Sequence, residues 1–296
     1  MKAIILSLLS FLFIQVASAQ RFDNVEITVE KINENLYVLF GAGGNIAVLT
    51  GSEGTVMIDN QFAPLSDKIM SAIGELTSQP IQYVINTHWH GDHTGGNANF
   101  AKQGATIIAH ENVRKRLMTD NVRPFGRTSE AQPEAAWPRL TFDKNMQVHH
   151  NGVSIQLLHY HAGHTDGDAL VMFGDYNVLH MGDIFFKDRF PFIDTALGGD
   201  PDGLIAIVEA ALMLSDANTT IIPGHGAISN KEDLRRYHQM LLIVKGRVMK
   251  AITAGTPLED VDVATIVKDY ETWGEGFIKP EVFVKTLYKA YSDEGE

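Results

Sequence analysis

The chain has 296 residues, of which 45% are hydrophobic and 20% charged, so the composition is typical of a globular protein and excludes disordered and low-complexity classes. The formal net charge is −12, which disfavours nucleic acid as a partner because like charges repel. The sequence contains no Cys, which excludes disulfides, iron–sulfur clusters and a thiol nucleophile.

The first nineteen residues have the features of a secretory signal peptide. Lys2 provides a basic start, residues 3–16 are mostly apolar, and Ala17-Ser18-Ala19 fits the small-residue rule for cleavage. This apolar stretch is shorter than the roughly 20 residues that a helix needs to cross a bilayer. We therefore expect a signal peptide at 1–19, a mature domain at 20–296 that is periplasmic or secreted, and no stable membrane anchor after cleavage.

The first part of the mature chain predicts strands followed by a strand–helix alternation. Short β-branched runs between turn residues predict an antiparallel meander over 25–60, with a hairpin tip at Gly41–Gly44. The helical spacing of Leu65, Ile69, Ile73 and Leu76 predicts a helix over 64–76, and residues 81–86 predict a strand. A strand at 105–110 and a helix through 116 continue the alternation.

The second part of the chain repeats this mixture. Strands are expected at 146–150, 153–159, 169–173, 178–181 and 220–222, with a helix at 202–214 and helices after the last strand. No internal repeat interrupts the pattern, so we expect a single α/β domain of sheets flanked by helices.

Residues 121–140 interrupt this regular pattern. The segment contains Pro124, Gly126, Pro133 and Pro138 with little periodicity, and it is longer than an ordinary connecting loop. It is expected to be either a lid or pocket wall that uses Phe125 and Trp137, or a surface decoration.

The segment that follows strand 81–86 carries a dense set of metal-ligand residue types. Since residues i and i+2 of an extended chain face the same side, His88 and His90 can both face one cation. The chain can turn at Gly91, after which Asp92 and His93 can face a second cation. Burying so many ionisable groups without a metal would be costly, so this segment predicts a metal site.

Three further ligand-type residues lie beside glycines after apolar strands: Ala162-Gly163-His164, Gly182-Asp183 and Gly224-His225. Strand ends that meet at one sheet edge can combine separate segments into one site. With these motifs the mature chain resembles the metallo-β-lactamase-fold superfamily of metallohydrolases over essentially its whole length.

The resemblance implies a four-layer αβ/βα sandwich and a site for two divalent metal ions. By position, one metal would be held by His88, His90 and His164 and the other by Asp92, His93 and His225, with Asp183 bridging them and Asp59 supporting the loop. We add Asp168 as a possible acceptor for a ligand ring, with a turn residue as its alternative. His161 is expected to support a ligand or line the pocket, although it could compete for metal.

Two divalent cations would activate a shared water as a bridging hydroxide that attacks a carbonyl, with Asp92 as the catalytic proton carrier. Zinc is the first expectation because the site is rich in His, and iron or manganese would also suit these ligands. The presence of Asp183 and the absence of Cys count against a dedicated β-lactamase.

The substrate is expected to be a small molecule such as a lactone, a β-lactam or another ester or amide. The alternatives are a glyoxalase-type thioesterase, an iron-dependent redox enzyme and a non-catalytic binding protein on the same fold. Trp89 is expected to pack against the sheet. The pocket is expected to use the apolar and charged residues that follow Asp183, unless the aromatics are buried in the core: Phe185, Phe186, Phe190, Phe192, Ile193, Lys187, Asp188 and Arg189.

Overall fold

The computed structural model describes residues 22–122 and 128–292, so the expected signal peptide at 1–19 and Phe125 lie outside the described residues. Two large β-sheets form the middle of the protein. The seven-stranded sheet has the order β1-β2-β3-β4-β5-β6-β9, with strands at Thr28–Lys31, Leu36–Phe40, Ile46–Leu49, Thr55–Ile58, Ile81–Ile85, Thr106–His110 and Leu140–Phe142. Strands β1 to β4 pair antiparallel, which confirms the predicted meander.

Helical connections make the rest of the first sheet parallel. After β4 the chain passes through η1 (Ala63–Leu65) and α2 (Ser66–Leu76) before β5, and through α3 (Gly91–Thr94) and α4 (Asn97–Lys102) before β6. Strand β9 then pairs parallel with β6 after α5 (Glu111–Leu117), the two-stranded ribbon β7 (Asn121–Val122) and β8 (Thr128–Ser129), and η3 (Glu134–Ala136).

The second sheet has five strands in the order β10-β11-β12-β13-β14: Asn145–His150, Val153–Leu158, Leu170–Phe173, Val178–His180 and Thr220–Ile222. Its strands pair antiparallel except for β13 and β14, which are parallel because α6 (Pro201–Leu214) connects them. The chain then forms α7 (Lys231–Thr253), α8 (Val263–Val267) and α9 (Pro280–Tyr291). Short 3-10 turns η4 to η8 lie at Gly174–Tyr176, Gly182–Ile184, Thr195–Leu197, Leu258–Asp260 and Glu271–Glu275.

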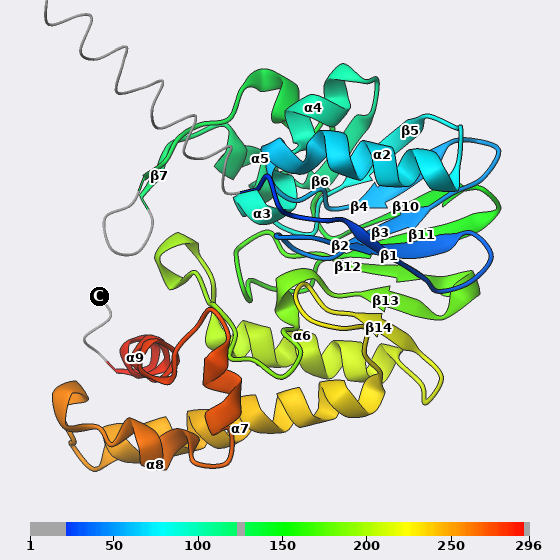
Figure 1. Cartoon of the computed structure of the whole chain (residues 1–296). Coiled ribbons are helices and arrows are strands. Elements are labelled where there is room, and N and C mark those ends of the chain that lie inside the picture. The colour runs from blue at the N-terminus through cyan, green and yellow to red at the C-terminus, as the bar shows by residue number, and fades with distance from the viewer. Residues whose placement is uncertain (1–21, 123–127, 293–296) are drawn as a thin grey trace, which may run out of the picture.

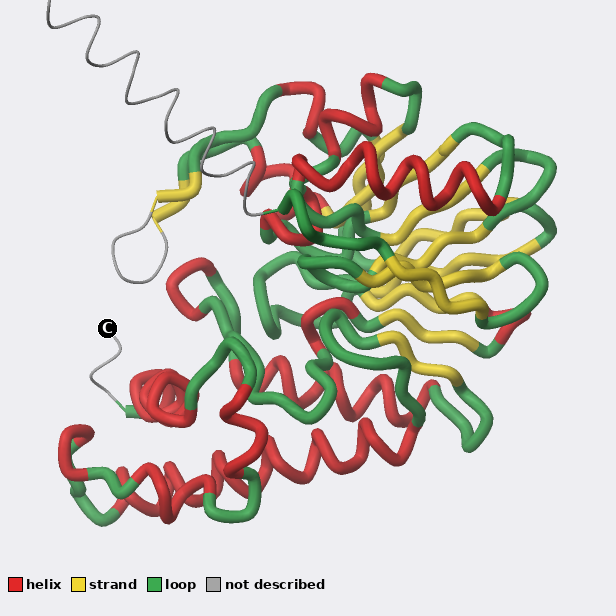
Figure 2. Tube along the Cα trace, viewed as in Figure 1, coloured by secondary structure: helices red, strands yellow, loops and turns green. Residues whose placement is uncertain are grey.

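The sheets face each other and the helices cover their outer faces (Figure 1, Figure 2). Between the sheets, Val38 and Ile58 of the first belong to the same buried cluster as Ile155 and Val171 of the second. On one outer face α2 packs Ile69 and Ile73 into a cluster with Val48 and Met57. On the other, α6 and α7 pack against the second sheet with Leu204, Val208, Leu241 and Val244. The expected four-layer α/β sandwich is therefore confirmed.

The first strand begins later than its sequence pattern predicts. The expected strand began at Val25, whereas β1 covers Thr28–Lys31. The ammonium group of Lys68 in α2 donates hydrogen bonds to the backbone oxygens of Phe22, Asp23 and Val25. These hydrogen bonds hold residues 22–25 against α2 and away from the sheet, so the pairing with β2 starts at Thr28.

Short elements account for most other differences from expectation. The helices α3 and α4 were not predicted because four and six residues make fewer than two helical turns, and β9 was not predicted because it has only three residues. The predicted excursion at 121–140 contains the ribbon β7–β8, which projects from the sandwich in Figure 1.

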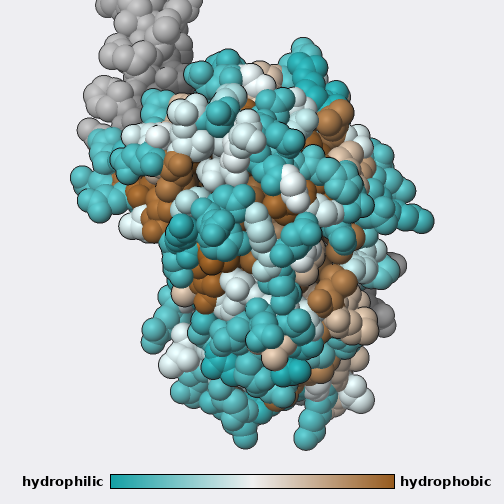
Figure 3. Space-filling view, turned by 90° about the vertical axis from the view of Figure 1, so that its right-hand side faces the viewer, coloured by the Kyte–Doolittle hydropathy of each residue, from teal (hydrophilic) through white to brown (hydrophobic). Residues whose placement is uncertain are grey.

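The surface is mixed in character. Figure 3 shows the face at the right-hand side of Figure 1, where hydrophilic side chains predominate and apolar ones form separate patches. Among the described helices, none combines the length and the hydropathy needed to span a membrane.

Candidate metal centre

The predicted metal ligands meet at one end of the sandwich because several strands end there. Strands β4 and β5 are parallel neighbours, so their carboxyl ends deliver Asp59 and the His88 segment to the same edge. Strands β13 and β14 do the same in the second sheet, where they deliver Asp183 and His225. The segment between β11 and β12 adds His164 at this edge.

The first ligand group consists of His88, His90, His164 and Asp183, all of them buried. The Nε2 atom of His164 lies 2.8 Å from Nδ1 of His90, and the ring of His88 lies 4.6 Å from that of His164. Three imidazoles at these separations present nitrogen atoms to one shared point. This is the donor set that a zinc-sized divalent cation takes.

The second ligand group consists of Asp92, His93 and His225, and it is more open. Nε2 of His225 lies 3.4 Å from Nε2 of His93 and 3.3 Å from Oδ2 of Asp92. The side chains of Asp92 and His225 are 28% and 21% exposed, whereas that of His93 is fully buried. Solvent therefore reaches the centre on the side of this second group.

Asp183 lies between the two groups. Its Oδ1 is 3.1 Å from Nε2 of His93 and 3.4 Å from Nε2 of His225, while its Oδ2 is 3.4 Å from Nε2 of His164. Each carboxylate oxygen thus faces a different group. Nε2 of His88 and Oδ1 of Asp183 are buried without a hydrogen-bond partner in the described residues, and buried polar atoms of this kind are satisfied when a cation binds. The residues present therefore fit two divalent metal ions.

The histidines of the two groups differ in their pKa values. Burial lowers the pKa of His88 and of His164, so both rings are neutral and ready to donate a lone pair. Burial alone would also lower the pKa of His93 and His225, but the carboxylate of Asp183 outweighs it. The pKa of His93 is raised well above its ordinary value, and that of His225 is raised to about 9.

Each ring of the first group is held by a hydrogen bond at the nitrogen that points away from the centre. Nδ1 of His88 donates to Oγ1 of Thr87 (3.0 Å), and Nδ1 of His164 donates to the backbone oxygen of Phe192 (2.7 Å). Nε2 of His90 donates to Oδ2 of Asp194 (2.9 Å). Such outer partners fix the tautomer and the orientation of metal-ligating rings.

Asp194 is a residue beside the centre that sequence reasoning missed. It is fully buried, and it follows η5 in a stretch without a ligand motif. A backbone hydrogen bond from Asp194 N to His164 O (2.9 Å) brings it to the centre. The one available signal was its chemistry: an acidic residue among apolar ones, eleven positions after Asp183.

Asp59 bonds to the His88 loop, which the resemblance implied it would support, and also contacts the second ligand group. Its carboxylate accepts hydrogen bonds from Nδ1 of His93 (2.7 Å) and from the backbone N and the hydroxyl of Thr87 (2.8 and 2.7 Å). Through Thr87 it also reaches His88. Its φ of 63° lies in the left-handed region, a strained conformation that proteins keep mainly at functional sites.

Two glycines permit the close packing of this centre. A Cβ on Gly44 would lie 2.1 Å from the ring of His93, and a Cβ on Gly224 would lie 2.0 Å from Oδ1 of Asp183. The hairpin that contains Gly44 is tied to the centre, because Gly44 N donates to the backbone oxygen of Asp92 (3.0 Å). Only residues without a side chain fit at these two points.

Two of the expected supporting residues have other positions. Asp168 accepts hydrogen bonds from the backbone N and the hydroxyl of Thr165 (2.8 and 2.6 Å), and burial raises its pKa to about 7. It therefore shapes the turn after His164, which was the alternative, and bonds to no ligand ring. His161 is exposed and forms no hydrogen bond or ring contact within the described residues, so its expected supporting role is wrong.

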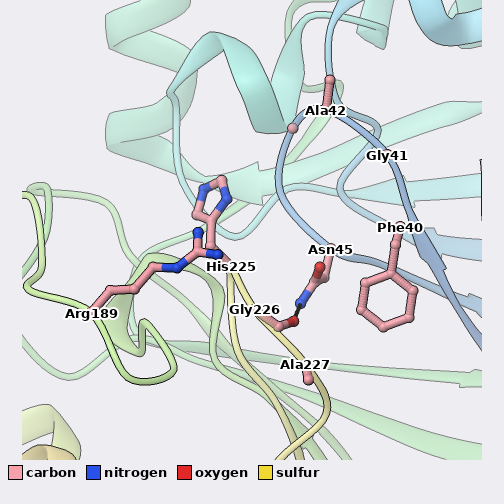
Figure 4. A pocket seen from close by; sticks show the side chains of 9 residues that line it. Phe40, Gly41, Ala42, Asn45, Arg189, His225, Gly226 and Ala227 are labelled. Carbon is pink, nitrogen blue, oxygen red and sulfur yellow. Dashed lines mark hydrogen bonds between the residues drawn. The ribbon is translucent and has the colours of Figure 1, made fainter. Parts of the chain in front are cut away.

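A cavity of about 440 Å³ lies beside the second ligand group, with His225 and Arg189 in its wall (Figure 4). Of the other expected pocket residues, Phe186 stacks on His225 with ring centroids 5.4 Å apart. Phe185 does not line the pocket: it is 1% exposed and packs on Tyr237 in the core, because the chain turns its side chain toward α7. The alternative of buried aromatics is correct for this residue.

Lys187 and Trp137 are also outside the wall of this cavity. Lys187 pairs with Asp233 of α7 at 2.8 Å, which holds its ammonium group away from the centre. The indole of Trp137 donates to the backbone oxygen of Gln132 and packs beside a cluster that includes Trp89. Trp89 is 3% exposed, in agreement with the expected packing role.

Comparisons with known proteins agree with these motifs. The family described as the metallo-beta-lactamase superfamily matches residues 39–225. A hydroxyacylglutathione hydrolase of Nitrosococcus oceani is 31% identical over 171 residues, covering 56% of this chain and 57% of that protein. The 2,4-dinitroanisole O-demethylase subunit alpha of a Nocardioides species is 24% identical over 165 residues, covering 54% and 47%. The matches thus span about half the length of these curated relatives.

Solved structures show the same fold. A metallo-beta-lactamase from Pontibacter korlensis superposes with a TM-score of 0.62 at 18% identity, covering 73% of this chain and 99% of that one. A double mutant of the sec-alkyl sulfatase PisA1 reaches 0.66 at 15% identity, covering 92% and 51%. The expected enzyme class, a metal-dependent hydrolase, agrees with the family match and with the similarity to a hydroxyacylglutathione hydrolase. By its motifs, its four layers and the family match, the chain belongs to the metallo-β-lactamase superfamily.

Proposed function

We propose that this chain is a dinuclear-metal hydrolase that cleaves the acyl C–O or C–N bond of a small lactone, β-lactam or other ester or amide, with lactones first. The observation that carries the proposal is the position of Asp183, whose two oxygens face two different ligand groups. A carboxylate placed in this way is suited to hold two cations at the short separation that two-metal hydrolases use.

The protein would hold one metal with His88, His90 and His164 and the other with the second ligand group. When bound, two such cations lower the pKa of a water molecule and polarise the carbonyl oxygen of a substrate. Zinc fits the imidazole-rich donor set best, while iron and manganese are alternatives that the carboxylates would also accept.

Asp92 is the proposed proton carrier. Burial would raise the pKa of its carboxyl, but the nearby His93 and His225 lower the pKa below its ordinary value, so the group is ionised at neutral pH. Its Oδ2 faces the two histidines, and its side chain is 28% exposed at the open edge of the centre. An ionised carboxylate at this edge can accept a proton and return it to a leaving group.

We also propose that the mature chain starts at Gln20 and acts in the periplasm or outside the cell, since Ala17 and Ala19 satisfy the cleavage rule. N-terminal sequencing of exported material tests this point. An intact Met1 in a soluble cytoplasmic fraction would contradict it.

A glyoxalase-type thioesterase is the second candidate. The similarity to a hydroxyacylglutathione hydrolase favours it. A thioester carbonyl would meet the same ligand groups, so the two candidates differ in substrate and share the chemistry of the centre.

A substrate panel tests the proposal. The chain from Gln20 onward, loaded with zinc, is assayed on lactones, β-lactams, thioesters and phosphoesters. We expect turnover of carbonyl substrates, and we expect Asp92→Asn to lower kcat by at least roughly 10²-fold because both the proton carrier and a carboxylate of the second ligand group are lost. The exposed Asp188→Asn, on the neighbouring loop, is the matched control and should keep full activity.

The same assay separates the rival functions. Preferred turnover of glutathione thioesters would support the second candidate. Full activity after chelation would contradict the metal mechanism, and oxygen consumption without any hydrolysis would favour a redox enzyme.

A further inference from the structure

Helix α5 contributes no ligand, yet it packs against the segments that build the first ligand group. It lies at the same end of the sandwich as α3 (Figure 1). Its residues Val113 and Leu117 form one buried cluster with Trp89 and Leu197. Trp89 stands between two ligands of the first group, and Leu197 lies three positions after Asp194. The apolar side of α5 thus contacts two of these segments.

The polar side of α5 reaches a third segment, the turn that follows His164. Nδ2 of Asn112 donates a hydrogen bond to the backbone oxygen of Asp166 (2.8 Å). One helical turn further on, Nη2 of Arg116 donates to Oδ2 of Asp166 (2.7 Å), and Nε of Arg116 lies 3.2 Å from the same oxygen. The turn after His164 is therefore fixed to α5 by two side chains.

Arg116 also joins this turn to the segment that contains Asp194. Its Nη2 donates a second hydrogen bond to the backbone oxygen of Leu197 (3.0 Å). Leu197 belongs to the short turn that begins at Asp194, because Leu197 N donates to Asp194 O (2.9 Å). Asp194 N in turn donates to His164 O (2.9 Å). One guanidinium thus connects the segment of a ligand with the segment of the carboxylate that holds another ligand.

These contacts suit a guanidinium better than an ammonium group. A guanidinium presents several N–H donors in fixed directions, so it can bind a carboxylate and a backbone oxygen at once. The side chains of Arg116 and Asp166 are 25% and 22% exposed, so solvent screens their attraction only in part. The two segments that Arg116 joins contain no regular element longer than the three residues of η6. Their positions therefore depend on a few contacts of this kind.

We infer that Arg116 is a positioning residue for the first metal, which keeps His164 and the Asp194–His90 pair at the separation that one cation requires. The inference rests on the metal centre of the proposed function. Arg116 bonds to Asp166 and Leu197 and acts on the ligands through the backbone of these segments. Loss of a direct outer partner weakens metal binding by roughly 10- to 100-fold, and we expect the lower end for a residue one contact further out.

Arg247 of α7 provides a matched control. Its guanidinium also joins a carboxylate and a backbone oxygen, since it pairs with Asp269 and donates to Ile266 O (2.7 Å). Its side chain is 27% exposed, close to the value for Arg116. These contacts link α7 to the region of α8, away from both ligand groups. Arg247→Met therefore removes a similar contact without touching the segments of the first group.

Zinc affinity, measured by competition with a chromogenic chelator, tests the inference. The variants are made in a His225→Ala background, which lacks a ligand of the second group, so that the first group gives the stronger binding step. We expect Arg116→Met to weaken this step about tenfold, whereas Arg247→Met should leave it unchanged. Arg116→Lys keeps a cation beside Asp166 without the planar fork and should show an intermediate loss.

Cobalt(II) in place of zinc gives a readout that a general loss of stability would not change. The visible absorption of bound cobalt depends on the geometry of its ligands. With one equivalent of cobalt in the same background, we expect Arg116→Met to shift these bands and Arg247→Met to preserve them. Thermal unfolding of the metal-free variants measures the structural effect of each substitution separately.

The outcomes separate a positioning role from a structural one. If both methionine variants lost stability and neither changed zinc affinity or the cobalt bands, the inference would be overturned. If Arg116→Met did not fold, Asp166→Asn would decide, because it leaves the bond to Leu197 in place. We expect this variant to lose about threefold in zinc affinity at the first group, and an unchanged affinity would overturn the inference.

None of these measurements uses turnover, so the proposed function is tested independently. A protein that binds zinc with the expected differences between variants but hydrolyses nothing on the substrate panel would remove the hydrolase function and confirm the role of Arg116. Hydrolysis by a protein whose zinc affinity ignores Arg116→Met would do the reverse.

Discussion

The two ligand groups of the metal centre are built for different tasks. The first is wholly buried, and each of its three rings is held by a fixed acceptor. The second opens to the cavity, and its histidines lie close to several carboxylates. The difference teaches that a buried, preorganised ligand group, in which burial lowers the pKa of His88 and His164, can lie beside a group whose histidines must lose protons before they bind metal.

Replacing Asp183 should have the largest effect, because this residue is shared by both groups. We expect Asp183→Ala to reduce the metal content below two per chain and to lower kcat/KM by roughly 10³-fold, at the upper end of the effect of removing one electrostatic group. Mass-spectrometric metal analysis and turnover measure the two effects. One metal per chain in the saturated unmodified protein would refute the dinuclear assignment.

The pKa difference predicts a pH dependence for metal uptake. The raised pKa of His225, about 9, means that this ring is protonated at pH 7 in the metal-free protein and must release its proton. Release of the His225 proton alone should therefore raise the affinity of the second group about 50-fold between pH 7 and 9, because about 1% of the rings are unprotonated at pH 7 and about half at pH 9. The first group should show little change in this range, since burial lowers the pKa of His88 and His164.

Calorimetry in buffers of different ionisation enthalpy counts the released protons. Uptake by the second group with no proton release at pH 7 would contradict the prediction. The raised pKa also makes the stability of the metal-free protein depend on pH. A His whose pKa is higher in the folded than in the unfolded protein stabilises the fold fully below the unfolded pKa of about 6.5. This contribution is lost as the pH rises through 9. The metal-free protein should thus lose stability from pH 7 to 9.

The outer acceptors allow the two groups to be perturbed separately. Asp194→Asn removes the carboxylate behind His90 and should weaken the first metal by roughly 10- to 100-fold, with the second metal little affected. Asp59→Asn should weaken both, since Asp59 contacts His93 directly and His88 through Thr87. Stepwise competition with a chromogenic chelator resolves the two affinities. If both variants weakened both metals equally, the assignment of Asp194 to the first group alone would be wrong.

His161 should give the smallest effect. Because its side chain is exposed and without hydrogen bonds in the described residues, His161→Ala should change metal affinity and turnover by less than twofold, and stability by less than about 0.5 kcal/mol. Thermal unfolding and metal titration check this. A clear loss of metal from the first ligand group in this variant would show that His161 does support that group.

The seven residues that the structure gathers into the two ligand groups were predictable because each has a local signature. Four of them lie within six residues, and the other three follow apolar strands beside glycines. The meander strands were also predictable from their short β-branched runs between turn residues, and α6 from its apolar helical segment. The four layers came from the resemblance, since periodicity alone does not place one sheet on another.

The residues that sequence reasoning misplaced depend on tertiary geometry. Phe185 and Phe186 are adjacent and chemically identical, yet one packs on Tyr237 in the core and the other stacks on His225. Asp194 reaches His90 only because the loop after η5 folds back across the sheet end, a contact between residues 104 positions apart. No local sequence pattern predicts the different packing of the two phenylalanines or the contact between Asp194 and His90.

The ligands come from both sheets, and this has a consequence for the cohesion of the sandwich. His93 and His225 are 132 residues apart in the chain, and each group combines residues that follow β5 with residues from the second sheet. A cation in either group is therefore a cross-link that closes a long loop and restricts the unfolded chain, as a disulfide does. A protein without a single Cys would thus gain its cross-links from metal, independent of the redox state around it.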